Sequence, residues 1–132
     1  MLASTIPKSQ KVKVIIRNLQ NKIPIRPRRI TQAVLKTLSY EGVRKSGEIT
    51  VSFVSDKEIQ ELNLKFLNRN RTTDVLAFDI SNNKKELIAD IIVSVQAAIR
   101  NAALFKTTPI SEVYLYIIHG VLHLLGYRDD KA

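Results

Sequence analysis

Alternation of hydrophobic and polar residues, which is typical of β-strands, recurs at four places along this chain. Residues 11–17 (KVKVIIR) alternate and contain β-branched side chains, and residues 48–54 repeat the pattern. Residues 74–80 (DVLAFDI) and 87–95 predict two further strands. Because the turn between these last two strands is short and rich in Asn and Lys, we expect them to form a hairpin.

Apolar residues three and four positions apart predict four helices between and after these strands. The first helix begins near Pro27, whose fixed φ suits a first turn. The second begins at Ser55, and Glu58 follows three residues later in the register of a capping box. Residues 96–105 predict the third helix, and a fourth begins at Pro109.

The resulting element order, βαβαββαα, predicts an α+β or mixed α/β fold. We expect a single domain over residues 1–132, with a four-stranded mixed sheet, helices packed on it, and right-handed connections at the first two helical crossovers. The composition, 45% hydrophobic and 25% charged, fits a soluble globular protein. The sequence has no cysteine, which excludes disulfides and thiolate metal sites. No apolar run reaches the ~18 residues of a membrane span, and no secretory signal is evident, so we expect a cytoplasmic protein without membrane contact.

Positive charge is concentrated in the first third of the chain. Residues 1–48 carry eleven basic and two acidic residues, whereas the rest of the chain is balanced. A polyanion such as RNA is therefore the expected partner, although a solvated basic face that only aids solubility is the alternative. The residues expected to contact RNA are Lys11, Lys13, Arg26, Arg28 and Arg29.

The strongest chemical signal is the stretch 119–129 (HGVLHLLGYRD). His119 and His123 are four residues apart, so on a helix they project from one face. Gly126 can end that helix in a left-handed conformation, after which Asp129 can turn back toward the imidazoles. Two imidazoles and a carboxylate suit one Zn²⁺ ion and leave a fourth position for water. The alternative is a structural histidine pair in a helix that is apolar on nearly every side, which itself predicts burial.

A zinc peptidase has similar spacing but requires a glutamate beside the first histidine as general base. Gly120 occupies that position, so proteolysis is disfavoured. A three-ligand zinc ion also lowers the pKa of bound water toward ~7 and polarises phosphoryl oxygens, which suits hydrolysis of an RNA phosphodiester. Asp74 and Asp90 are candidates for a general base only if they face the metal; structural or capping roles are the alternative.

Several stretches together resemble one protein family. HGVLHLLGYRD is similar to the metal motif of the YbeY family, which comprises bacterial single-strand endoribonucleases and rRNA maturation factors. TTDVLAF (72–78), the Leu62-Asn63 pair and DIIVS (90–94) also fit the family pattern in order and spacing. The resemblance implies a metal-dependent endoribonuclease active in rRNA maturation and ribosome quality control, with rRNA or the small ribosomal subunit as partner.

The chain departs from the family pattern at three positions. Asp129 stands where the family most often has His, and its negative charge makes the metal a weaker Lewis acid. Leu67 occupies the place of an Arg that the family links to RNA cleavage, and Ala77 replaces a usual Ser. The neighbouring Arg69 and Arg71 are the candidates for clamping the substrate. Besides the enzyme, a non-catalytic rRNA-binding or ribosome-binding assembly factor with a structural metal therefore stays open.

Overall fold

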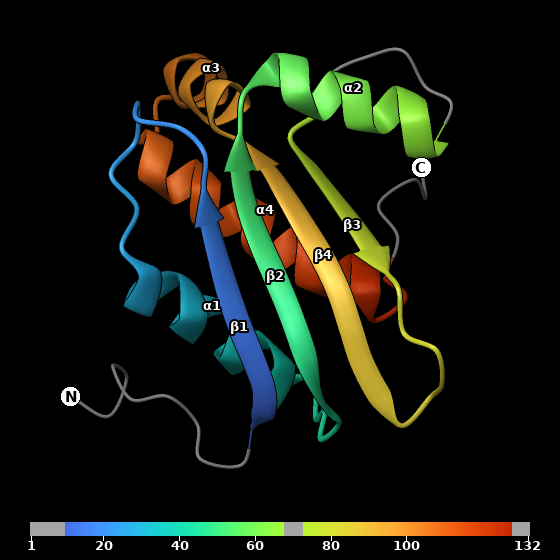
Figure 1. The fold of residues 1–132 in the computed structure, drawn as a ribbon. Coiled ribbons are helices and arrows are strands. Elements are labelled where there is room, and N and C mark those ends of the chain that lie inside the picture. Colours follow the sequence, from blue (N-terminus) through green and yellow to red (C-terminus); the bar gives the residue numbers. More distant parts are fainter. Residues whose placement is uncertain (1–9, 68–72, 128–132) are drawn as a thin grey trace, which may run out of the picture.

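The computed structural model describes residues 10–67 and 73–127, and these contain the eight predicted elements in the predicted order (Figure 1). The strands are β1 (Lys11–Asn18), β2 (Ser46–Val54), β3 (Val75–Asp79) and β4 (Glu86–Ser94). The helices are α1 (Pro27–Tyr40), α2 (Asp56–Leu67), α3 (Val95–Phe105) and α4 (Pro109–Leu124). The predicted α+β fold is confirmed.

The four strands form one mixed sheet in the order β1-β2-β4-β3. β1, β2 and β4 are parallel, and β3 is antiparallel to β4, which confirms the predicted hairpin. Since β3 also runs antiparallel to β2, the handedness rule for parallel crossovers does not apply to the connection through α2. The expectation of a right-handed crossover there was wrong for this reason.

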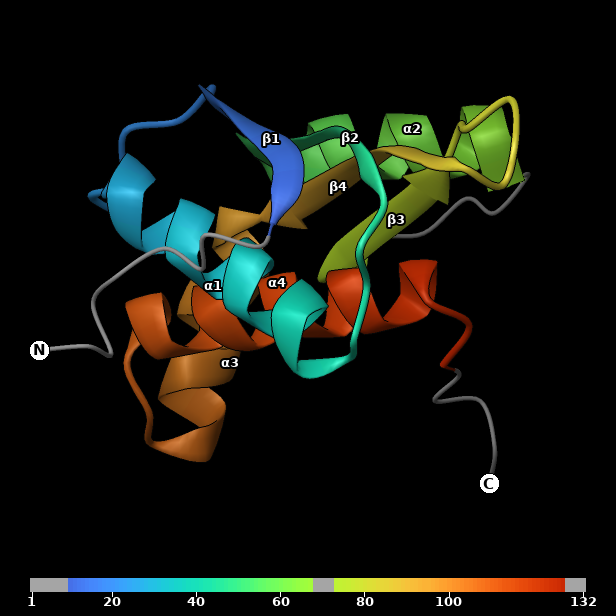
Figure 2. The ribbon, with the colours of Figure 1, turned by 90° about the horizontal axis from the view of Figure 1, so that it is seen from below.

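Helices cover the two faces of the sheet unequally. α1 and α4 pack against one face, with α3 beyond them against α4, whereas α2 lies over the opposite face (Figure 2). The main core lies between the sheet and α1 and α4. Its central members alternate along the strands and are fully buried: Ile49, Val51, Phe53, Ile91 and Val93.

The opposite face has a smaller core under α2. Ile59 of that helix packs with three strand residues, Val54, Leu76 and Ile92. The sequence predicts that the leucines and the phenylalanine of this helix fill its apolar side. Instead, Leu64, Phe66 and Leu67 are exposed, because α2 covers only part of the sheet and buries a single stripe.

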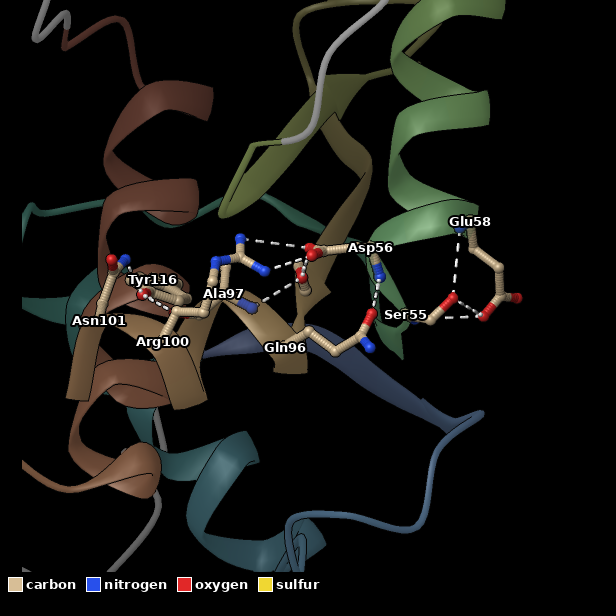
Figure 3. A network of polar contacts seen from close by, with 9 residues as sticks. Ser55, Asp56, Glu58, Gln96, Ala97, Arg100, Asn101 and Tyr116 are labelled. Atoms are coloured by element: carbon tan, nitrogen blue, oxygen red, sulfur yellow. Dashed lines mark hydrogen bonds and ion pairs between the residues drawn. The ribbon is translucent and has the colours of Figure 1, made fainter. Parts of the chain in front are cut away.

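The capping box at the start of α2 is confirmed. The backbone N–H of Glu58 donates to Ser55 Oγ at 3.3 Å, and the Ser55 N–H donates to Glu58 Oε1 at 3.2 Å. The next residue, Asp56, accepts hydrogen bonds from Ser94 Oγ at 2.8 Å and from the Arg100 guanidinium (Figure 3). These contacts tie the start of α2 to the start of α3.

The ion pair and hydrogen bonds of Asp56 should make the free energy of unfolding depend on pH. Burial alone would raise its pKa, but the hydrogen bonds from Arg100 and Ser94 and the charge of Arg100 lower the pKa below its ordinary value of 3.8. Stability from a lowered pKa is present above the ordinary value and is lost as the pH falls through the folded-state pKa. We expect Asp56→Asn to reduce the free energy of unfolding by about 1 kcal/mol at pH 7, a modest figure because Arg100 is largely exposed.

Urea denaturation between pH 3 and pH 7 measures this effect. The difference between the two proteins should shrink as the pH falls below about 4. A difference that stays constant across this range would show that the Asp56 carboxylate does not contribute through its charge.

Candidate metal and RNA site

α4 carries both histidines and buries only one of its sides. Its buried residues recur at helical spacing and include Val113, Tyr116, Ile117, Gly120 and Val121. On the other side, Leu115 and Ile118 are 43% and 37% exposed. The expectation that this helix is buried on nearly every side was therefore wrong, because apolar residues also occur where α4 has no neighbour to cover them.

Gly120 sets how closely α4 approaches the sheet. A Cβ atom added there would lie 2.9 Å from Ile91 Cγ2 and 3.4 Å from Val75 Cγ2. The helix therefore rests on β4 and β3 through a residue without a side chain. In the sequence, Gly120 showed only that the glutamate required by a zinc peptidase is missing. A glycine inside a helix costs ~1 kcal/mol relative to alanine, and this cost was the available signal for a packing role.

Gly120→Ala is expected to lower the free energy of unfolding by about 1–2 kcal/mol. Overpacking of this kind costs ~1–3 kcal/mol, and the higher helix propensity of alanine offsets ~1 kcal/mol. The same change should shift the backbone of α4 beneath His119, which nuclear magnetic resonance of the amide groups can detect. A variant as stable as the wild type, with unchanged spectra around His119, would mean that α4 lies farther from Ile91 than we describe.

The two histidines lie on the same side of the line along which α4 contacts the sheet. At 3.6 residues per turn, positions four apart differ by only about 40° around the helix axis, and both lie roughly 60–100° from the direction of Gly120. His119 is half-buried and His123 is exposed. Neither histidine belongs to the main core, against which Gly120 packs through Ile91 and Val75.

The end of α4 confirms the predicted helix exit. Gly126 has a φ of +98°, its N–H donates to the His123 carbonyl at 3.0 Å, and the Tyr127 N–H donates to the Leu122 carbonyl at 3.0 Å. This is a Schellman motif, which reverses the chain directly after the histidines. Tyr127 Oη then donates to Glu41 Oε1 at 2.6 Å, which holds the reversed segment against the end of α1.

The predicted third ligand and the predicted substrate clamps cannot be placed. Asp129, Arg69 and Arg71 all lie outside the described residues. Within residues 10–67 and 73–127, three metal-ligating side chains do not gather at any one point. The described part of the site is thus a pair of imidazoles one turn apart on α4, and the role of Asp129 as the third ligand stays a prediction.

Of the two candidate general bases, Asp90 lies on the face of the sheet opposite α4. Asp90 alternates along β4 with Ala89 and Ile91, which face α4, so its side chain lies on the opposite face. There it lines a groove of about 550 Å³ beside α2, away from the histidines. Asp90 therefore does not fit the role of a base at this metal site.

Asp74 lies at the start of the edge strand β3. Its carbonyl accepts a hydrogen bond from the Ser94 N–H at 2.9 Å, directly before β3 begins. Burial raises the pKa of Tyr116 to about 12, against a hydrogen bond from Asn101, and the charges of Glu112 and Asp74 add to the rise. The role of Asp74 as a general base at the histidines stays a prediction.

The basic residues predicted to contact RNA fall into two groups. Lys11 and Lys13 alternate with Val12 on β1, so they lie on the face opposite the main core. Arg26, Arg28 and Arg29 lie at the first turn of α1, which covers the core face. All five side chains are exposed, but they do not form the single cluster that the sequence suggested.

Comparisons with known proteins show which family the chain belongs to. The sequence model of a family described as "Endoribonuclease YbeY" matches residues 15–132. The chain belongs to the YbeY endoribonuclease family. Endoribonuclease YbeY of Syntrophus aciditrophicus is 38% identical over 123 residues, which cover 89% of this chain and 76% of that protein. The YbeY of Carboxydothermus hydrogenoformans is 35% identical over 124 residues, covering 89% and 85%.

The solution structure of TM1509 from Thermotoga maritima has the same fold. It matches with a TM-score of 0.59 and 26% identity, and the match covers 92% of this chain and 79% of that one. The predicted YbeY family and the predicted endoribonuclease class are thereby confirmed. Within the described ranges, no helix is long and apolar enough to cross a membrane.

Leu67 and Ala77 are the two departures from the YbeY pattern that lie within the described residues, and Leu67 is the one linked to RNA cleavage. It is the last residue of α2 and is 42% exposed. An apolar side chain therefore faces solvent at the position where the family resemblance places an arginine. Nothing in the packing of α2 requires leucine there.

Proposed function

We propose that this protein is a zinc-dependent single-strand endoribonuclease that takes part in rRNA maturation and ribosome quality control in the cytoplasm. His119, His123 and Asp129 hold one zinc ion, and Arg69 and Arg71 clamp the RNA phosphate. The observation that carries the proposal is the surface-facing histidine pair, followed at once by the Schellman reversal at Gly126. Membership of the YbeY family supports the RNA substrate.

The chain's own residues prepare the site for such chemistry. Contact between Gly120 and the sheet fixes α4, so the two imidazoles keep a constant separation without the ion. Exposed cations on both faces of the sheet attract the RNA backbone. When bound, a zinc ion supplies Lewis acidity toward a phosphoryl oxygen and toward water.

Metal removal tests the proposal. The purified protein should contain one zinc ion per chain by elemental analysis and should cleave an end-labelled single-stranded RNA. Dialysis against a chelator should abolish cleavage, and added zinc should restore it. RNA binding, measured separately by anisotropy, should survive chelation and weaken steeply with salt. Cleavage that persists in zinc-free protein would overturn the proposal.

A non-catalytic rRNA-binding or ribosome-binding factor with a structural metal is the second candidate, and the exposed Leu67 is the observation that favours it. Leu67→Arg separates the two, with Leu64→Arg as the matched control because Leu64 is 46% exposed on the same helix. Cleavage that appears only in the Leu67 variant would identify the present chain as a binding factor. Cleavage by the unmodified chain would identify it as an enzyme.

A further inference from the structure

A second cavity lies at the opposite end of α4 from His123. It has a volume of about 520 Å³ and lies between the loop after β1, the first turn of α1, and the start of α4. Pro109 and Tyr114 of α4 form part of its apolar wall. At 1.5 Å per residue, Pro109 is about 21 Å from His123 along the helix, so this cavity is separate from the proposed cleavage site.

Every charged residue that lines this cavity is a cation: Lys22, Arg26 and Arg29. None of the three has an ion-pair partner among the described residues. The first turn of α1 contains no acidic residue, and Arg26 provides no side-chain cap, so the unpaired N–H groups there add to the positive potential.

This arrangement is unfavourable for stability alone. Arg26 and Arg29 lie at the N-terminus of α1, where cations oppose the helix dipole, and they also repel each other and Lys22. An anion bound between them would reverse both effects. Arginine favours phosphate in particular, because its planar guanidinium can donate two parallel hydrogen bonds to a pair of phosphate oxygens.

The apolar walls of the cavity indicate which chemical group the phosphate is attached to. The Tyr114 ring and the ring of Pro109 offer apolar surface beside the cations, and the cavity volume falls in the ~300–1,000 Å³ range of ligand sites. Nucleobases stack on such side chains without sequence preference. An acidic peptide without aromatic side chains would satisfy the cations but would leave the Tyr114 ring without a stacking partner.

We propose that this cavity binds a nucleoside phosphate, with the phosphate on Arg26 and Arg29 and the base against Tyr114. The ligand is either one nucleotide of an RNA strand or a free nucleotide. Binding of a nucleotide within an RNA strand rests on the proposed function, because the same RNA would also reach the histidines. Binding of a free nucleotide does not depend on the cleavage chemistry.

Titration with AMP tests the site, monitored by nuclear magnetic resonance of the backbone amides and isoleucine methyl groups. AMP should shift the signals of Ile110 and Tyr114 and should bind more tightly than adenosine or inorganic phosphate. Arg29→Gln should weaken AMP binding about tenfold, the effect of one lost charge-assisted hydrogen bond. Arg28→Gln is the matched control, since Arg28 is exposed in the same turn but does not line the cavity, and it should change binding less than twofold.

Competition distinguishes the two sources of the nucleotide. If the ligand belongs to a strand, AMP will compete with single-stranded RNA, and Arg29→Gln will weaken the binding of both. If the ligand is a free nucleotide, Arg29→Gln will weaken only AMP binding. Equal losses in the Arg28 and Arg29 variants, shifts confined to other regions, or tighter binding of a polyglutamate peptide than of AMP would overturn the proposal.

His119→Ala separates this inference from the proposed function. It should abolish RNA cleavage and leave AMP binding unchanged. Loss of AMP binding in that variant would place the nucleotide at the histidines and so contradict the separate cavity.

Discussion

His123→Ala should reduce RNA cleavage by at least about 100-fold and prevent stoichiometric zinc binding. Replacing even the hydrogen-bond partners of metal ligands commonly costs 10–100-fold in metal affinity or activity, so removing a ligand should reach at least the upper end of that range. Because His123 is exposed on α4, the metal-free variant should keep its fold, with a free energy of unfolding within ~0.5 kcal/mol of the metal-free wild type.

The stabilising effect of zinc provides a readout other than activity. A ligand present at 100 times its dissociation constant stabilises the native state by ~2.7 kcal/mol, so zinc should raise the melting temperature of the wild type. It should not raise that of the His123 variant. Leu115→Ala, at another exposed position of the same helix, should behave as the wild type in both assays. A His123 variant that keeps both zinc binding and cleavage would remove the histidine pair from the site.

The local elements were predictable because short-range chemistry determines them. The Ser55–Glu58 capping box and the left-handed Gly126 depend on residues within a few positions of each other, and both are present as the sequence indicated. The β3–β4 hairpin likewise follows from two alternating segments joined by a short turn. For the site, this was enough to place His119 and His123 one turn apart at the end of a helix.

The relations that the sequence did not show depend on which face of the sheet each element covers. Alternation along β4 shows that Asp90 lies opposite Ile91, but it does not show that α4 packs on the Ile91 side. Lys13 of β1 and Arg29 of α1 belong to one basic segment of the sequence, but they lie on different faces of the sheet. The sequence did not show this for the same reason. Long-range packing decides these relations, and a single sequence carries no direct signal for it.

The close approach of β2 to β4 at Gly47 is another feature that the sequence did not show. The sequence places Gly47 at the start of a strand, where a glycine needs no special reason. In the structure it pairs with Val12 on one side and with Leu87 on the other, at the centre of three parallel strands. A Cβ added to Gly47 would lie 2.0 Å from the Leu87 carbonyl oxygen. A glycine inside a paired strand is the only sequence signal for such a contact.

Gly47→Ala should therefore be the most destabilising single substitution that we predict, with a loss of about 4 kcal/mol or more. Its φ of +153° is unfavourable for residues with a side chain, and the clash is with backbone, which cannot move without separating β2 from β4. Out of a total stability of ~5–15 kcal/mol, this loss should lower the melting temperature by roughly 15 °C.

Gly42→Ala supplies the control because Gly42 also has a positive φ, +74°, but nothing lies within 4 Å of an added Cβ. It should cost only the ~1–2 kcal/mol of the left-handed backbone conformation. The difference between the two variants in urea denaturation measures the steric contact with Leu87 together with the difference between the two backbone conformations. Equal losses in both variants would mean that β2 and β4 are not in contact at Gly47, and the strand order that positions α4 and its histidines would then need to be redrawn.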